Sequence, residues 1–87
     1  MNDFLLHLHN EISRLLLIGE DLLPEEKQLL DSIIETIWLL ERFAEVSKNK
    51  KLYQITEDLD YAIRHFRVPF KAEAALKDAA TNIAAYK

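Results

Sequence analysis

The sequence has no cysteine, one glycine and two prolines among 87 residues. Without cysteine the chain can form neither a disulfide nor a thiolate metal site, so its stability must come from packing. A single glycine excludes a glycine-rich phosphate loop and leaves few turns for a fold built from strands. No apolar run approaches the roughly 20 residues of a membrane span, and the first residues lack the basic region of a signal peptide. We therefore expect a soluble protein without a standard export signal.

What the chain has in abundance is helical periodicity. Hydrophobic residues make up 49% of the sequence and recur every three or four positions. This spacing predicts helices at about 3–18, 24–46, 51–66 and 69–85. Gly19 is placed to end the first helix, and Pro24 and Pro69 each fit a first helical turn. The sequence thus predicts one all-α domain over 1–87, an antiparallel up-down four-helix bundle.

The pattern also predicts how these helices pack. We expect the second helix to be the spine of the core, with Ile37 at its centre and Trp38 as a large core residue. The alternative for Trp38 is an exposed anchor for a partner, because tryptophan is enriched at interface hot spots. The fourth helix has an alanine-rich face, so we expect it to be the least firmly docked. Phe66 and Phe70 are expected to brace the corner between the last two helices from within.

No pattern of catalytic or metal-binding residues stands out. His7 and His9 would diverge by roughly 200° on a helix, so they cannot share a metal ion. His65 suggests a phosphotransfer histidine, but no glycine follows it and the helix is about to end. The carboxylate pairs at 25–26 and 57–60 are expected at helix starts, where the macrodipole favours them. We predict a protein that is not an enzyme and that binds no metal or cofactor.

The charges are distributed unevenly along the chain. Residues 1–46 contain ten acidic and three basic residues, which gives a net charge of -7. Residues 47–87 contain five acidic and eight basic residues, which gives +3, so the chain as a whole has a formal net charge of -4. The basic residues form two groups, which are our candidate partner-binding residues: Arg64, Arg67 and Lys71 around Pro69, and Lys48, Lys50 and Lys51 after the second helix. Cations at helix ends also complement the dipole. An anionic lipid surface or acidic protein face is the expected partner, and nucleic acid is disfavoured because the chain is acidic overall.

Three stretches resemble the immunity proteins of pediocin-like (class IIa) bacteriocins: "LLHLHNEI", "LPEEKQLL" and "LDYAIRHFRVPFKAEAAL". The resemblance implies a cytoplasmic protein, peripheral to the inner membrane face, that protects a producing cell from its own bacteriocin. Such a protein acts on a bacteriocin-occupied receptor, a sugar-transport permease, from inside the cell. The resemblance also implies that the C-terminal half of the chain recognises the partner. The chain departs from the family pattern in ending at Tyr86-Lys87, where many members carry a longer tail.

A second hypothesis comes from a different class of protein. The second helix carries more apolar residues than three short neighbours can cover, namely Ile33, Ile34, Ile37, Trp38, Leu39, Leu40 and Phe43. An exposed strip of this size marks an interface. The alternative is therefore a structural protein whose bundle is completed by homodimerisation.

Overall fold

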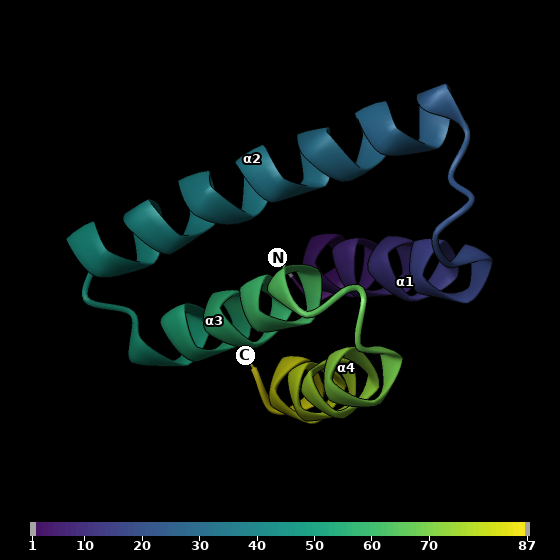
Figure 1. Cartoon of the computed structure of the whole chain (residues 1–87). Coiled ribbons are helices and arrows are strands. Elements are labelled where there is room, and N and C mark those ends of the chain that lie inside the picture. The colour runs from purple at the N-terminus through teal and green to yellow at the C-terminus, as the bar shows by residue number, and fades with distance from the viewer. Residues whose placement is uncertain (1, 87) are drawn as a thin grey trace.

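The computed structural model describes residues 2–86 and contains four α-helices: α1 (Asn2–Ile18), α2 (Pro24–Val46), α3 (Lys50–Arg64) and α4 (Pro69–Ala85) (Figure 1). The predicted all-α four-helix bundle is confirmed, and two of the four helices have the predicted bounds. The first helix begins one residue earlier than predicted. The third begins one residue earlier and ends two residues earlier. None of the helices described is both long enough and apolar enough to cross a bilayer.

The helix ends follow from local chemistry. Gly19 adopts a left-handed backbone with a φ of 83°, as expected for the residue that ends a helix, and its N–H bonds to the Leu15 carbonyl. The Asn49 side chain accepts a hydrogen bond from the Leu52 N–H at 3.1 Å and so starts α3 earlier than predicted. Pro69 opens α4, and the preceding Val68 has a non-helical backbone.

Helix α3, and not α2, is the centre of the bundle. It makes the two most extensive helix–helix contacts, with α4 and with α2. It buries six residues, whereas α2 buries only Ile33, Ile37 and Ala44. The expectation that the second helix is the spine was therefore wrong, although Ile37 itself is fully buried.

Helix α4 is more firmly docked than its composition predicted. It buries five residues, against α3 and α1: Ala72, Ala75, Leu76, Ala79 and Ile83. Its alanines allow the backbones to approach closely, and the dispersion attraction between close-packed atoms adds to the small area that alanine side chains bury. Asn82 adds a hydrogen bond to Asp58 on α3 at 2.8 Å.

Helix α2 is the least covered element. It packs mainly on α3, touches α1 over a short length and makes no contact with α4 among the residues described. Trp38 is 57% exposed, so the prediction that it is a core residue was wrong. Three further large apolar side chains in the C-terminal half of α2 are also exposed: Leu39, Phe43 and Val46.

Candidate functional site

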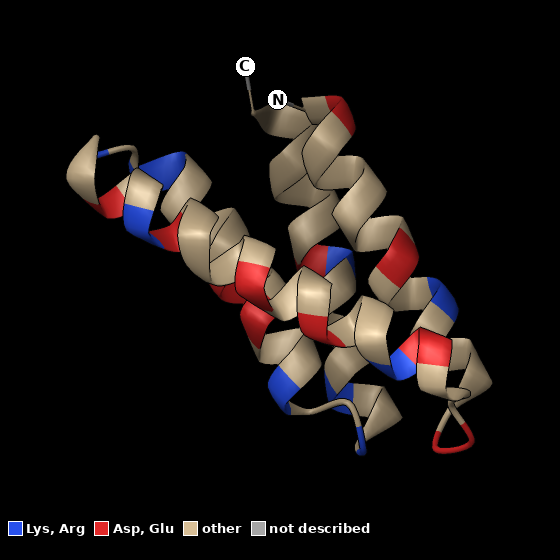
Figure 2. Ribbon diagram, turned by 90° about the horizontal axis from the view of Figure 1, so that it is seen from above, with Lys and Arg blue, Asp and Glu red and all other residues tan. Residues whose placement is uncertain are grey.

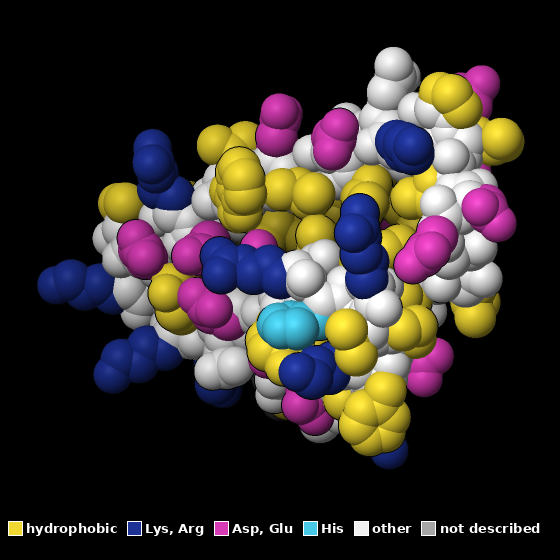
Figure 3. Space-filling model, viewed as in Figure 1, with side chains coloured by type: hydrophobic (Ala, Val, Ile, Leu, Met, Phe, Trp, Pro, Cys, Tyr) yellow, Lys and Arg dark blue, Asp and Glu magenta, His cyan; other side chains and the backbone are white. Residues whose placement is uncertain are grey.

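One hollow near the predicted basic residues lies where the α1–α2 loop meets the α3–α4 turn. We call it the corner groove, and its volume is about 660 Å³. Its apolar lining comes from Leu22, Leu30, Ile63, Phe66 and Val68, and its charged lining from Glu20, Lys27, Arg64 and Arg67. Figure 3 shows this face of the molecule hollowed, with hydrophobic side chains inside and charged side chains of both signs around them.

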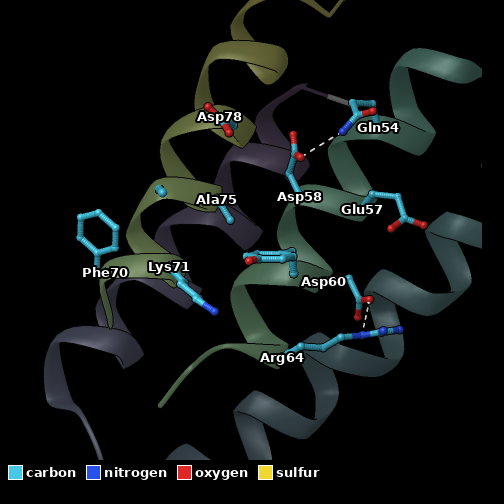
Figure 4. Close-up of a pocket in the computed structure, with 11 residues that line it drawn as sticks. Gln54, Glu57, Asp58, Asp60, Arg64, Phe70, Lys71, Ala75 and Asp78 are labelled. Carbon is cyan, nitrogen blue, oxygen red and sulfur yellow. Dashed lines mark hydrogen bonds and ion pairs between the residues drawn. The ribbon is translucent and has the colours of Figure 1, made fainter. Parts of the chain in front are cut away.

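The α3–α4 turn forms one wall of the corner groove. Its backbone is fixed by hydrogen bonds within the turn, from the N–H groups of His65, Phe66 and Val68 to carbonyls three or four residues earlier. Phe66 is half-buried and packs against the core, as predicted. Phe70 is 84% exposed, so the expectation that it braces the corner from within was wrong. Its position in the first turn of α4 points it away from the bundle (Figure 4).

Arg64 is held in place by a buried carboxylate. Its Nε lies 2.8 Å from Oδ2 of Asp60, one helical turn earlier, and the two are joined by a dashed line in Figure 4. Asp60 is only 5% exposed, whereas the Arg64 side chain is 71% exposed. The carboxylates at 57–60 lie well inside α3 and not at a helix start, so the dipole explanation for them was wrong. The role of Arg64 is therefore partly structural, because it pairs with the buried Asp60 carboxylate.

Arg67 and Lys71 are exposed and form no ion pair among residues 2–86. Arg67 lines the corner groove, and Lys71 lines a second groove of about 510 Å³ between α3 and α4. Arg64 borders both grooves, so the three basic residues of the α3–α4 corner lie on adjoining surfaces. The acidic loop after the first helix lies near this turn, because Glu20 lines the same groove.

The other three predicted residues lie elsewhere. Lys48, Lys50 and Lys51 are exposed at the α2–α3 connection. Lys50 begins and Arg64 ends the same 15-residue helix, which separates them by about 21 Å along its axis. Figure 2 shows basic residues at both ends of the molecule, with the acidic α1–α2 loop at the end that holds the α3–α4 turn. The six candidates thus form two separate surfaces.

Acidic residues gather between α2 and α3, beside the corner. Burial raises the pKa of Glu41, and the nearby carboxylates of Glu57, Asp60 and Glu45 raise it further, while Arg64 lowers it. The pKa of Tyr53 is raised to about 12. The largest cause is a hydrogen bond to Glu57, and the second is the repulsion between the Glu57 carboxylate and the phenolate. Arg64 is thus the cation that offsets this negative region.

Two of the three histidines make contacts with other residues of the fold. Nε2 of His9 lies 2.9 Å from the Leu76 carbonyl oxygen, which joins α1 to α4 at the edge of the core. The His65 ring stacks on Tyr61 with the ring centres 4.0 Å apart. Within residues 2–86, no three His, Asp or Glu side chains are arranged to hold a metal ion.

The chain matches no protein-family model, no curated protein and no solved structure.

Proposed function

We propose that this chain is a non-enzymatic helical binding module that acts as a bacteriocin immunity protein. The observation that carries the proposal is the corner groove, which combines an apolar lining with the exposed face of Arg64 and with Arg67, a cation that forms no ion pair among residues 2–86. An apolar centre with a charged rim is the usual composition of a protein–protein interface. The partner that fits is a protein face carrying acidic groups.

The resemblance to pediocin-like immunity proteins supports this choice. Its longest stretch, "LDYAIRHFRVPFKAEAAL", covers the end of α3, the turn and the start of α4, and therefore supplies one wall of the groove. The stretch "LPEEKQLL" begins α2 and supplies Lys27 and Leu30 on the facing wall. Two of the three stretches that carry the resemblance therefore meet at this surface.

The cellular setting follows from the same proposal. The protein works in the cytoplasm, at the inner face of the membrane, where it binds a sugar-transport permease that a bacteriocin has occupied. Basic residues at this corner also favour proximity to an anionic leaflet, through attraction of about 1 kcal/mol for each cation near the surface. The binding blocks permeabilisation without any chemical step.

Expression in a bacteriocin-sensitive cell tests the proposal. Cells that carry the chain should survive at least one member of a panel of pediocin-like bacteriocins at concentrations that kill cells with an empty vector. They should remain sensitive to a membrane-permeabilising peptide that needs no permease. Killing by every bacteriocin of the panel, with the protein present in soluble form, would contradict the proposal, and so would equal protection against both kinds of peptide.

A further inference from the structure

A second surface lies on α2, away from the corner groove. It consists of four large apolar side chains that are each more than half exposed, and we call it the α2 strip: Trp38, Leu39, Phe43 and Val46. These residues lie in the C-terminal half of the helix, whereas the corner groove meets α2 near its start. A strip of exposed aromatic and aliphatic side chains on one helix is typical of an interface.

The charges beside the strip are arranged symmetrically. Glu35, Trp38, Leu39 and Arg42 line one shallow hollow and follow each other at i, i+3, i+4 and i+7 along one face of α2. Glu35 lies three residues before Trp38, and Arg42 lies three residues after Leu39. Neither charge forms an ion pair among the residues described. The hollow therefore has an apolar centre with one negative and one positive end.

We propose that two copies of this chain pair through this face, with their α2 helices antiparallel. A two-fold axis between Trp38 and Leu39 places Glu35 of each copy opposite Arg42 of the other, which forms two equivalent ion pairs. It also places Trp38 of each copy against Leu39 of the other. A parallel pairing would bring like charges together, so it is disfavoured. A symmetric contact of this kind is self-complementary and closes at two copies.

The size of the strip sets the strength of the pairing. Each of the four side chains is between half and four-fifths exposed, so together they offer an apolar surface on the order of 400 Å² per copy. A standard interface buries about 800 Å² per partner. The pairing is accordingly weak and depends on concentration. It leaves the corner groove open, so it stands independently of the proposed immunity function.

Sedimentation of the purified protein over a concentration series gives the dissociation constant of the pair. Trp38 is the only tryptophan, so its emission should also shift to the blue as the strip becomes covered. Glu35→Arg and Arg42→Glu should each weaken the pairing by about tenfold, because each change creates two like-charge contacts. The double variant carrying both changes should restore the wild-type constant to within about threefold.

Exposed residues on α4 provide matched controls. Glu73→Arg and Lys77→Glu make the same kind of charge reversal on a different face, and each should leave the dissociation constant unchanged. A mass that stays monomeric at every concentration would overturn the proposal. So would a double variant that pairs no better than the single variants. A monomer whose tryptophan emission shifts only when anionic vesicles are added would overturn it in favour of a lipid surface.

Discussion

Replacing Ile37 with alanine tests whether the core is assembled as described. Ile37 is fully buried on α2, the helix with the fewest buried residues, so it carries a large share of the attachment of that helix to the core. The change removes three carbon atoms. At about 0.8 kcal/mol for each buried methylene, the transfer loss is about 2.4 kcal/mol, and the residual cavity brings the expected range to about 2–5 kcal/mol. A domain of this size has a total stability on the order of 5–15 kcal/mol.

Urea unfolding followed by circular dichroism measures this change in the free energy of unfolding. Leu39→Ala is the matched control, because Leu39 lies two positions along the same helix and is 70% exposed. It should change the free energy by less than about 0.5 kcal/mol when the protein is dilute enough to be monomeric. If Ile37→Ala and Leu39→Ala cost the same, the assignment of the inner and outer faces of α2 is wrong.

Two other substitutions test the electrostatics between α2 and α3. The pKa of Glu41 is raised in the folded protein, so folding favours the protonated form of this side chain. The stability that the protonated form contributes is fully present below the ordinary glutamate pKa of about 4.3, and it is lost as the pH rises through the raised pKa. Glu41→Gln should therefore raise the melting temperature at pH 7, and this increase should vanish near pH 4. An equal increase at the two pH values would contradict the raised pKa of Glu41. Arg64→Gln leaves the buried Asp60 carboxylate without its partner, so it should lower the melting temperature more than Arg67→Gln does, and equal effects would show that the ion pair adds no stability.

The sequence was sufficient to predict the helices because its local signals agree. Gly19, Pro24 and Pro69 mark helix boundaries through backbone chemistry that does not depend on the rest of the fold. Both ends of α3 were predicted inaccurately. Its start is set by Asn49, which could have been identified as a cap, and its end by how far ahead of Pro69 the helix stops. Local rules therefore predicted the elements to within two residues.

The packing was harder to predict, because one periodic pattern fits several arrangements. Helix α2 is apolar around much of its circumference, so periodicity could not show which side faces α3, and Trp38 was placed in the core. The burial of α4 depends on close approach through its alanines, which area-based reasoning underrates. In each case the deciding quantity was the contact between helices, which a single sequence does not contain.

The candidate site was predicted in part. The residues around Pro69 were singled out from charge alone, and their proximity to the acidic α1–α2 loop follows from the order of the helices. The division of the six cations into two groups was also predicted from the sequence, and in the structure the two groups lie at opposite ends of α3. The buried position of Asp60 was missed, although its spacing of four residues from Arg64 is a signal of a helical ion pair.

The most direct test of the corner groove compares two double variants in the bacteriocin protection assay. Arg67→Gln/Lys71→Gln removes the two cations of the α3–α4 corner that pair with no carboxylate among residues 2–86, and it leaves the Arg64–Asp60 pair intact. Lys50→Gln/Lys51→Gln removes the same charge at the other end of α3, and each variant changes the formal net charge from -4 to -6 by the loss of two positive charges. We expect both variants to melt close to the wild type, the corner variant to lose protection and the loop variant to keep it. Equal protection by the two variants would show that the corner groove is not the binding surface.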